Sequence, residues 1–268
     1  MDFSEDQVRR YARHIILKEV GGTGQARLLQ SSVLVVGAGG LGSPLLLYLA
    51  AAGVGRLGVI DDDVIDLSNL QRQILHDTDS IGLAKVTSAQ ATLRRINPEV
   101  TVEAHRRRLD PSNALELFGR YDLVADGSDN FATRFLVNDA CYFAKRTLVS
   151  AAILRFDGQL ATYKPHQGGP CYRCLFREPP PPDFVPSCAQ AGVLGAIAGI
   201  LGAMQATEVV KELLGIGDSL MGQLVLYDAL ATDMRKVKVK PDPGCPLCGA
   251  KPSIRDLGGD YSGHDCNG

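Results

Sequence analysis

Short strand-like runs alternate with longer amphipathic stretches over the first 150 residues of the chain. Strands are predicted at 33–36, 59–63, 100–104, 121–126 and 147–150, where the residues are mostly aliphatic or alternate with polar ones. Helices are predicted at 5–17, 25–30, 45–52, 83–96, 113–118 and 131–145, with a glycine run at 21–24 between the first two. This order predicts an α/β protein with a Rossmann-like, doubly wound sheet and a parallel core.

The pattern changes after residue 150. Hairpin-like strands are predicted around 159–163, with later strands at 224–227 and 236–240, so antiparallel strands should extend the sheet. The lysines of 236–240 favour an edge position for the last strand. The longest apolar stretch contains glutamines and four glycines, which indicates a buried helix over 193–214 and not a membrane span.

The first predicted strand ends in a glycine-rich turn. Gly37, Gly39 and Gly42 have the GxGxxG spacing, which lets a backbone approach a phosphate at the N-terminus of the following helix. Asp61 follows the second strand about 20 residues later and can accept a ribose hydroxyl. A nucleotide site is therefore predicted here, with a glycine turn kept only for packing as the alternative.

The longest polar connection of the chain, residues 66–73, follows the second strand. Such connections usually take two to six residues, so a longer one indicates binding. Asn69, Arg72 and, further on, Lys85 supply neutral and cationic donors, which suits a triphosphate better than a diphosphate bridge. A solvated loop with incidental charge is the alternative.

Composition and charge exclude several classes of function. The 268 residues carry a net charge of −2, and no basic run is longer than 106–108, so nucleic acid is not expected as a ligand. The chain is long enough to form a full hydrophobic core. The N-terminus lacks a basic and apolar signal pattern, which favours a cytoplasmic protein without membrane attachment.

Seven cysteines in a cytoplasmic chain favour metal ligands or nucleophiles over disulfides. Four of them form two CxxC pairs, Cys171 with Cys174 and Cys245 with Cys248. Each pair can present two thiolates from one turn, and two turns complete a tetrahedral site, so a structural zinc that clasps the C-terminal segment is predicted. A redox-active CxxC is the alternative.

Three further residues have two readings each. Asp129 follows the strand predicted at 121–126 and could face the ligand as a metal-side carboxylate or cap the next helix. Cys188 precedes a helix and could be an activated nucleophile or a small buried residue. Arg13 is most simply a solvated surface residue.

The chain closely resembles the ubiquitin-activating-enzyme-like superfamily, specifically the bacterial ThiF/MoeB/HesA adenylyltransferases. The resemblance covers about residues 4–249. It is carried by Arg-His-Ile-Ile-Leu (13–17), the glycine loop (37–42), Asp61 with Asp63, Leu-Ser-Asn-Leu-Gln-Arg-Gln (67–73), Lys85, Asp-Gly-Ser-Asp-Asn (126–130), Cys-Tyr-Arg-Cys (171–174), Cys-Ala-Gln-Ala-Gly-Val (188–193) and Cys-Pro-Leu-Cys-Gly (245–249).

The resemblance implies one adenylation domain over 1–249, and the Gly-, Asp- and Ser-rich composition of 250–268 predicts a flexible tail. It implies that the C-terminal Gly-Gly of a ubiquitin-like sulfur carrier attacks the α-phosphate of Mg-ATP. The implied nucleotide-binding residues are Gly37, Gly39, Gly40, Gly42, Asp61, Asp63, Ser68, Asn69, Leu70, Gln71, Arg72, Lys85, Asp129 and Asn130. The implied catalytic residues are Arg13, Arg72, Lys85, Asp129 and Cys188.

Within this set, the resemblance assigns the ribose to Asp61, Mg²⁺ to Asp129 and a reach into the other subunit of a homodimer to Arg13. Gly127-Ser128 replaces a common Cys-Thr pair, which should be tolerated. No rhodanese-like domain follows Gly268, so a separate sulfur donor is expected. Phe176 stands where thiamin-pathway members often have Trp, which favours a molybdopterin-type carrier without excluding the thiamin type.

Two other classes of function compete with adenylation. A nicotinamide-dependent oxidoreductase shares the glycine loop and Asp61 but explains neither the cationic loop nor the cysteines. An inactive module that only docks a ubiquitin-like protein would not need Asp61, Arg72, Lys85 and Asp129 together.

Overall fold

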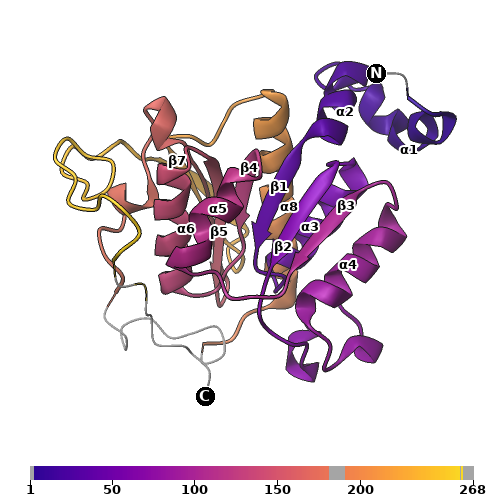
Figure 1. Ribbon diagram of the computed structural model, residues 1–268, viewed down its shortest axis with the longest axis horizontal. Coiled ribbons are helices and arrows are strands. Elements are labelled where there is room, and N and C mark those ends of the chain that lie inside the picture. Colours follow the sequence, from indigo (N-terminus) through magenta and orange to yellow (C-terminus); the bar gives the residue numbers. More distant parts are fainter. Residues whose placement is uncertain (1–2, 181–190, 260, 262–268) are drawn as a thin grey trace.

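A computed structural model describes residues 3–180, 191–259 and 261. Within them, eight strands form one sheet in the order β3-β2-β1-β4-β5-β6-β7-β8 (Figure 1). The strands are β1 (Ser32–Val36), β2 (Arg56–Ile60), β3 (Thr101–His105), β4 (Leu123–Asp126), β5 (Thr147–Leu154), β6 (Asp157–Tyr163), β7 (Gln223–Asp228) and β8 (Asp233–Lys238). Strands β1 to β5 pair in parallel and β5 to β8 antiparallel, which confirms the predicted fold class, including the edge position of the last strand.

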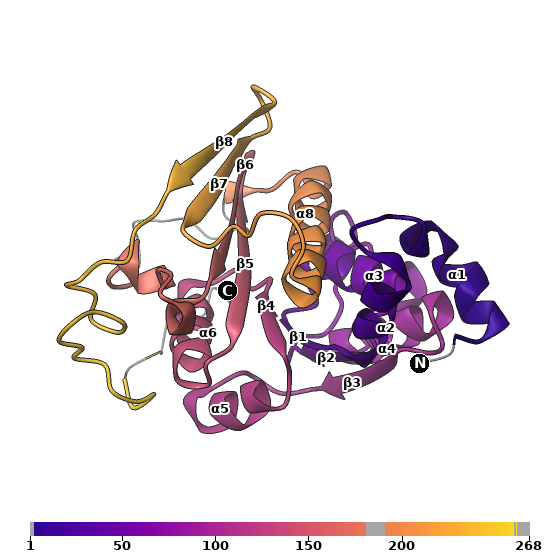
Figure 2. The ribbon, with the colours of Figure 1, turned by 90° about the horizontal axis from the view of Figure 1, so that it is seen from above.

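Helices cover both faces of the sheet (Figure 2). They are α1 (Glu5–Ile15), α2 (Gly21–Gln30), α3 (Gly42–Ala52), α4 (Lys85–Ile96), α5 (Pro111–Gly119), α6 (Phe131–Phe143) and α8 (Gly195–Leu214). Successive residues of a strand point to opposite faces. Val33 and Val35 of β1 accordingly pack with α3, α4 and α8, whereas Leu34 and Val36 pack with α5 and α6.

Helix α2 starts four residues earlier than predicted, because the glycine run at 21–24 is helical and does not break the chain. A Cβ on Gly24 would lie 3.2 Å from Val20 and 3.5 Å from Leu214, so a small residue suits this position. The helix is held by burial of Leu28 and by Gln25, whose amide donates to the Ala52 carbonyl. Tertiary packing therefore overrides the low helix propensity of glycine.

Helix α8 crosses the sheet face beside α3 (Figure 2). Its close approach relies on glycine, because a Cβ on Gly202 would lie 2.6 Å from the Leu41 carbonyl oxygen. Ten of its 20 residues are buried, which confirms the prediction of a buried helix. Among the described residues, no helix combines the length and the apolar character needed to cross a bilayer.

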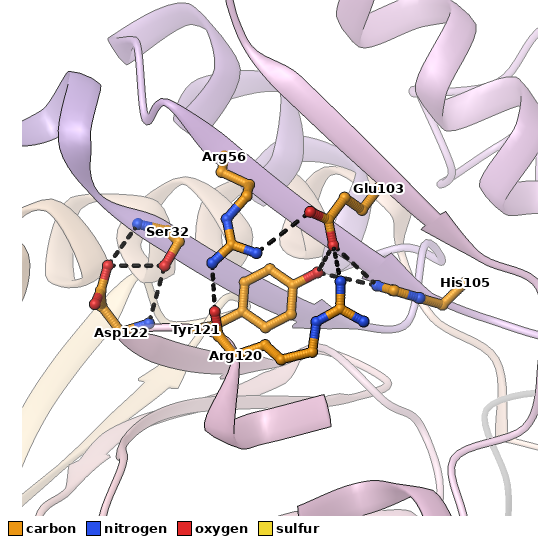
Figure 3. Close-up of polar contacts among 7 residues, drawn as sticks. All are labelled: Ser32, Arg56, Glu103, His105, Arg120, Tyr121 and Asp122. Atoms are coloured by element: carbon orange, nitrogen blue, oxygen red, sulfur yellow. Dashed lines mark hydrogen bonds and ion pairs between the residues drawn. The ribbon is translucent and has the colours of Figure 1, made fainter. Parts of the chain in front are cut away.

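Polar side chains cover the sheet face near the start of β2 and β4, the end opposite to the glycine turn (Figure 3). Glu103 accepts hydrogen bonds from Tyr121 at 2.7 Å, Arg120 at 2.9 Å and Arg56 at 3.3 Å. The Tyr121 ring lies over Gly58, where a Cβ would be 2.3 Å from the phenol oxygen. This cluster thus stabilises the sheet away from the candidate site.

Part of the segment predicted to be a flexible tail is packed on the body of the protein. Leu257 is buried in the core cluster that contains α5 and α6. Tyr261 donates a hydrogen bond of 2.8 Å to Asp139 of α6. This packing was not predictable from composition, because the segment is rich in Gly, Asp and Ser, which is typical of disorder.

Asp139 also forms a buried ion pair with Arg173. Arg173 contacts both carboxylate oxygens of Asp139 at 2.7–3.0 Å and lies over the Phe135 ring. The pair connects α6 to the first CxxC turn.

We expect Arg173→Met to lower the free energy of unfolding by about 3 to 5 kcal/mol, because it leaves the Asp139 carboxylate buried without its cation. Chemical denaturation measures the loss. The matched control is Arg177→Met, whose ion pair with Asp242 is exposed and should contribute at most about 1 kcal/mol. Similar small losses in both variants would contradict the assignment.

Candidate active site and metal centre

The glycine loop lies where the strand order of the sheet reverses, with β2 on one side of β1 and β4 on the other. Ligands of open α/β sheets bind in the crevice at this point. Gly37 has φ of +91°, and a Cβ on Gly42 would lie 1.9 Å from the Gly37 carbonyl oxygen. These two positions require glycine, and the N-terminus of α3, the positive end of the helix dipole, follows directly at the crevice.

Asp61 holds the glycine loop in place. One carboxylate oxygen accepts a hydrogen bond from the Ala38 N–H at 2.8 Å, and the other accepts from the Asp63 N–H at 2.9 Å. Burial raises the pKa of Asp61, while the positive charge of Lys85 and these two donors oppose the rise. The carboxylate is therefore already oriented at the end of β2 before a ligand is bound.

His76 holds the same residue, Ala38, through its carbonyl group. Its Nε2 lies 2.9 Å from the Ala38 carbonyl oxygen, and its Nδ1 lies 3.0 Å from the Ser88 hydroxyl. Burial lowers the pKa of His76 below 6.5, which favours the neutral ring. Since the carbonyl can only accept, Nε2 carries the proton and Nδ1 accepts from Ser88. Sequence reasoning missed this residue, because its partner lies 38 positions away.

Lys85 begins α4 with a buried side chain, 8% exposed. Its ammonium group donates to Asp63 at 2.7 Å, and the Asp63 side chain is 56% exposed. The ion pair places the Lys85 ammonium group beside the crevice, with its counterion on the solvent side.

The 66–73 connection is folded and is not a solvated coil. Asp66 caps the short helix η1 (Leu67–Asn69) by accepting from Ser68, and Asn69 accepts in return from the Asp66 N–H. Hydrogen bonds from Ser68 lower the pKa of Asp66. Arg72 donates to the Ser68 carbonyl at 3.0 Å. Of the other predicted residues, Leu70 is half-buried and Gln71 is exposed.

This connection packs against the glycine loop. A Cβ on Gly40 would lie 3.5 Å from Cγ of Arg72, and a Cβ on Gly39 would lie 3.7 Å from Nε2 of Gln73. Arg72 therefore lies beside the predicted phosphate-binding turn. Lys85 is linked to Asp61 in a similar way, because its ion-pair partner Asp63 donates a backbone hydrogen bond to Asp61.

The loop after β4 completes the crevice. A Cβ on Gly37 would lie 3.2 Å from the Gly127 carbonyl oxygen, so the two loops touch. Asn130, not Asp129, caps α6 by accepting from the Thr133 N–H at 2.8 Å. The capping alternative for Asp129 is therefore wrong, and its carboxylate is exposed.

The structure does not bring Arg13 to this crevice. Arg13 is exposed on α1, which lies with α2 beyond the start of β1, whereas the glycine loop follows the end of that strand (Figure 1). Cys188 lies outside the described residues.

The two CxxC pairs form one cluster, with all four sulfurs within 4.8 Å of one another. The Sγ–Sγ distances are 3.9 Å for Cys171–Cys174, 3.6 Å for Cys171–Cys245, and 3.4 Å for both Cys174–Cys248 and Cys171–Cys248. A tetrahedral zinc with Zn–S bonds of about 2.3 Å would separate its sulfurs by about 3.8 Å, so the donor set fits such an ion.

The surroundings of the four sulfurs also suit a metal. Hydrogen bonding to Cys174 and Cys248, together with burial, raises the pKa of Cys171, so a cation is needed to hold four thiolates together. The Asp242 N–H points at the sulfur of Cys174 from 3.4 Å. This single cluster favours a metal centre over two separate redox pairs.

Comparison with known proteins identifies the family. The model described as "ThiF family" matches residues 11–247. The chain belongs to the ThiF family. This membership does not support the nicotinamide-dependent alternative.

Relatives of this ThiF-family chain are similar over nearly all of it. The bovine "Adenylyltransferase and sulfurtransferase MOCS3" is 53% identical over 95% of this chain, which covers 56% of the bovine protein. The "Sulfur carrier protein adenylyltransferase" of Thermus thermophilus is 51% identical, with 96% of both chains covered. The "SAMP-activating enzyme E1" of Haloferax volcanii is 52% identical over 94% of this chain and 93% of its own. The chain thus spans little more than half of the MOCS3 proteins that it matches.

Solved structures support the ThiF-family fold. E. coli MccB, crystallised with AMPCPP and MccA, superposes with a TM-score of 0.79 at 22% identity, over 90% of this chain and 74% of MccB. At this identity the likeness concerns the fold alone.

The neutral state of His76 gives a pH test. In the unfolded chain this histidine binds a proton below about pH 6.5, whereas in the folded chain its pKa is lower and the ring stays neutral. The free energy of unfolding should therefore fall as the pH drops below 6.5. His76→Gln should reduce this slope by up to about 1.4 kcal/mol per pH unit. Urea denaturation between pH 5 and 8 measures both curves. Parallel curves would show that His76 is not held neutral.

Proposed function

We propose that this protein uses ATP to adenylate the C-terminal glycine of a ubiquitin-like sulfur-carrier protein. The observation that carries the proposal is the meeting of the glycine loop, Arg72 and the Lys85–Asp63 pair at the reversal of strand order. Two cations beside a phosphate-binding turn suit a triphosphate. The names of relatives about 50% identical over this whole region, all of which include adenylation or activation, point the same way.

The chain's own residues divide the work by charge. Asp61 accepts the ribose hydroxyls, the glycine loop offers backbone N–H groups, and Asn69, Arg72 and Lys85 contact the phosphates. Attack of a carboxylate at the α-phosphate needs its growing negative charge neutralised more than it needs covalent help. When ATP binds, its phosphates replace Asp63 as the partner of Lys85.

Asp129 is the residue that would hold Mg²⁺. Its carboxylate is exposed and has no capping role, and oxygen donors are those that Mg²⁺ prefers. Bound Mg²⁺ would neutralise phosphate charge and help pyrophosphate to leave.

The partner follows from the chemistry. The adenylated carrier would then accept sulfur from a separate donor protein. The carrier is of the molybdopterin or the thiamin type.

We expect Lys85→Ala, Arg72→Ala and Asp129→Ala each to lower carrier-dependent ATP–pyrophosphate exchange by about a hundredfold or more, the scale of one lost charge contact in a desolvated site. Candidate carriers with and without the terminal glycines are assayed in parallel. Arg94→Ala, which removes an exposed charge from the end of α4, is the matched control. Wild-type rates in all three site variants would refute the proposal.

We also propose that the active unit is a homodimer in which Arg13 reaches the partner's nucleotide. The support is the exposure of Arg13 on a helix beyond the opposite end of β1, where it cannot serve its own site. Chains carrying Arg13→Ala or Arg72→Ala, each nearly inactive, should regain activity when mixed, since one hybrid site combines both wild-type residues. No recovery in hybrid dimers shown by mass spectrometry to form would exclude this role.

The cysteine cluster should hold one zinc ion per chain with a structural role, since four sulfurs leave no position open for substrate. Chelation should lower the melting temperature, and Cys248→Ser should lose the metal. Cys141→Ala, which removes a buried cysteine outside the cluster, should retain it. Metal analysis that finds no zinc, or a reversible disulfide within either pair, would contradict this.

A further inference from the structure

The first turn of α8 touches the backbone that carries Arg72. A Cβ on Gly195 would lie 2.2 Å from the Gln71 carbonyl oxygen and 3.2 Å from Cα of Arg72. In glycine a hydrogen occupies that direction. Any other residue would force the backbones apart, because a carbonyl oxygen of the main chain cannot rotate away as a side chain does.

The same turn reaches the glycine loop. A Cβ on Gly40 would lie 3.4 Å from Cβ of Ala198, and 3.5 Å from Cγ of Arg72. The start of α8, the glycine loop and the aliphatic stem of Arg72 therefore meet at one point. The helix forms one wall of the space that Arg72 occupies.

Helix α8 is fixed much more firmly than the connection that it touches. Gln205 donates to the carbonyl groups of Asp126 and Val149 at 2.8 Å and 3.0 Å, which fixes the helix to β4 and β5. In the connection, Leu67 is 67% exposed and the following Ile74 is 60% exposed. The contact with α8 therefore helps to fix the position of residues 71–72.

The start of the helix is also held from the preceding side. Arg155, in the turn between β5 and β6, donates through its N–H to the Gly192 carbonyl and accepts from the Leu194 N–H. Movement of Gly195 away from Gln71 would therefore have to break contacts with the sheet.

We propose that Gly195 is a positioning residue for Arg72: by allowing α8 to pack on the 71–72 backbone, it sets where the guanidinium meets the nucleotide phosphates. The proposal rests on the function proposed above, since it requires Arg72 to contact ATP. In Gly195→Ala the added methyl displaces residues 71–72, and the guanidinium no longer matches the phosphate oxygens.

A purely structural role for Gly195 predicts lost stability without a specific loss of binding. The helix supplies a matched control, because Gly199 lies one turn further on and a Cβ there meets nothing within 4 Å among the described residues. Gly199→Ala adds the same methyl to the same helix, where alanine favours helix formation.

The test is calorimetric titration of the full chain with MgATP, together with its melting temperature, for the wild type, Gly195→Ala, Gly199→Ala, Arg72→Ala and the Gly195→Ala/Arg72→Ala double variant. We expect Gly195→Ala to weaken MgATP binding about tenfold or more, the scale of a lost charged hydrogen bond. Gly199→Ala should stay within about twofold of the wild type. In the Arg72→Ala background, Gly195→Ala should have no further effect on binding. Both substitutions remove the same contact between the guanidinium and the phosphates, so their effects do not add.

Unchanged MgATP binding by folded Gly195→Ala would overturn the inference and leave the proposed function intact. An equally large loss of MgATP binding from Gly195→Ala in the Arg72→Ala background would also overturn the inference. A wild-type protein that does not bind MgATP would instead overturn the proposed function, and this inference with it.

Discussion

Close backbone contact around the end of β1 is the constraint on which the site depends. The turn can fold back on itself because Gly42 has no Cβ to meet the Gly37 carbonyl, and the loop after β4 touches Gly37 in turn. Gly195 extends the same contact to the 66–73 connection. Side chains at these positions would separate the three segments that form the crevice. Packing this close leaves little freedom to rearrange, so the N–H groups are oriented before a ligand arrives.

Charge is arranged around this packed backbone at some expense to stability. Asp61 has a pKa raised by burial, so its ionised form is disfavoured in the fold. His76 is kept neutral by its surroundings, and Lys85 is buried with one exposed carboxylate as its partner. These groups orient one another through Ala38 and Asp63. A fold selected for stability alone would not need them, whereas a site for a polyanion does.

Local patterns predicted most of the fold, and they singled out residues that the fold brings together at the end of β1. The aliphatic run before Gly37 correctly indicated a central strand, because a strand buried on both faces is apolar throughout. The lysines of β8 correctly indicated an edge strand, because charged side chains protect an exposed edge. Contacts between distant residues were not predictable in this way. The helix through the glycine run at 21–24 depends on packing against Leu214, and the His76–Ala38 bond joins segments that meet only after the sheet has formed.

The cysteine cluster was only partly predictable from the sequence. The CxxC spacing predicted that the four cysteines belong to one site, but only folding could show that Cys171 and Cys245, 74 positions apart, lie side by side. The role of Asp129, in contrast, could not be predicted from the sequence. Aspartate and asparagine are equally good helix caps, so the sequence could not say whether Asp129 or Asn130 caps α6, and hence whether the Asp129 carboxylate remains free for a ligand.

We expect the crevice to bind a nucleoside triphosphate and not a dinucleotide. The most direct test is to titrate the wild-type protein in a calorimeter with MgATP and, in parallel, with NAD⁺. We expect saturable MgATP binding that weakens as the salt concentration rises, because the contacts are between charges, and no heat from NAD⁺ at the same concentrations. Tight NAD⁺ binding without a signal from MgATP would contradict this account.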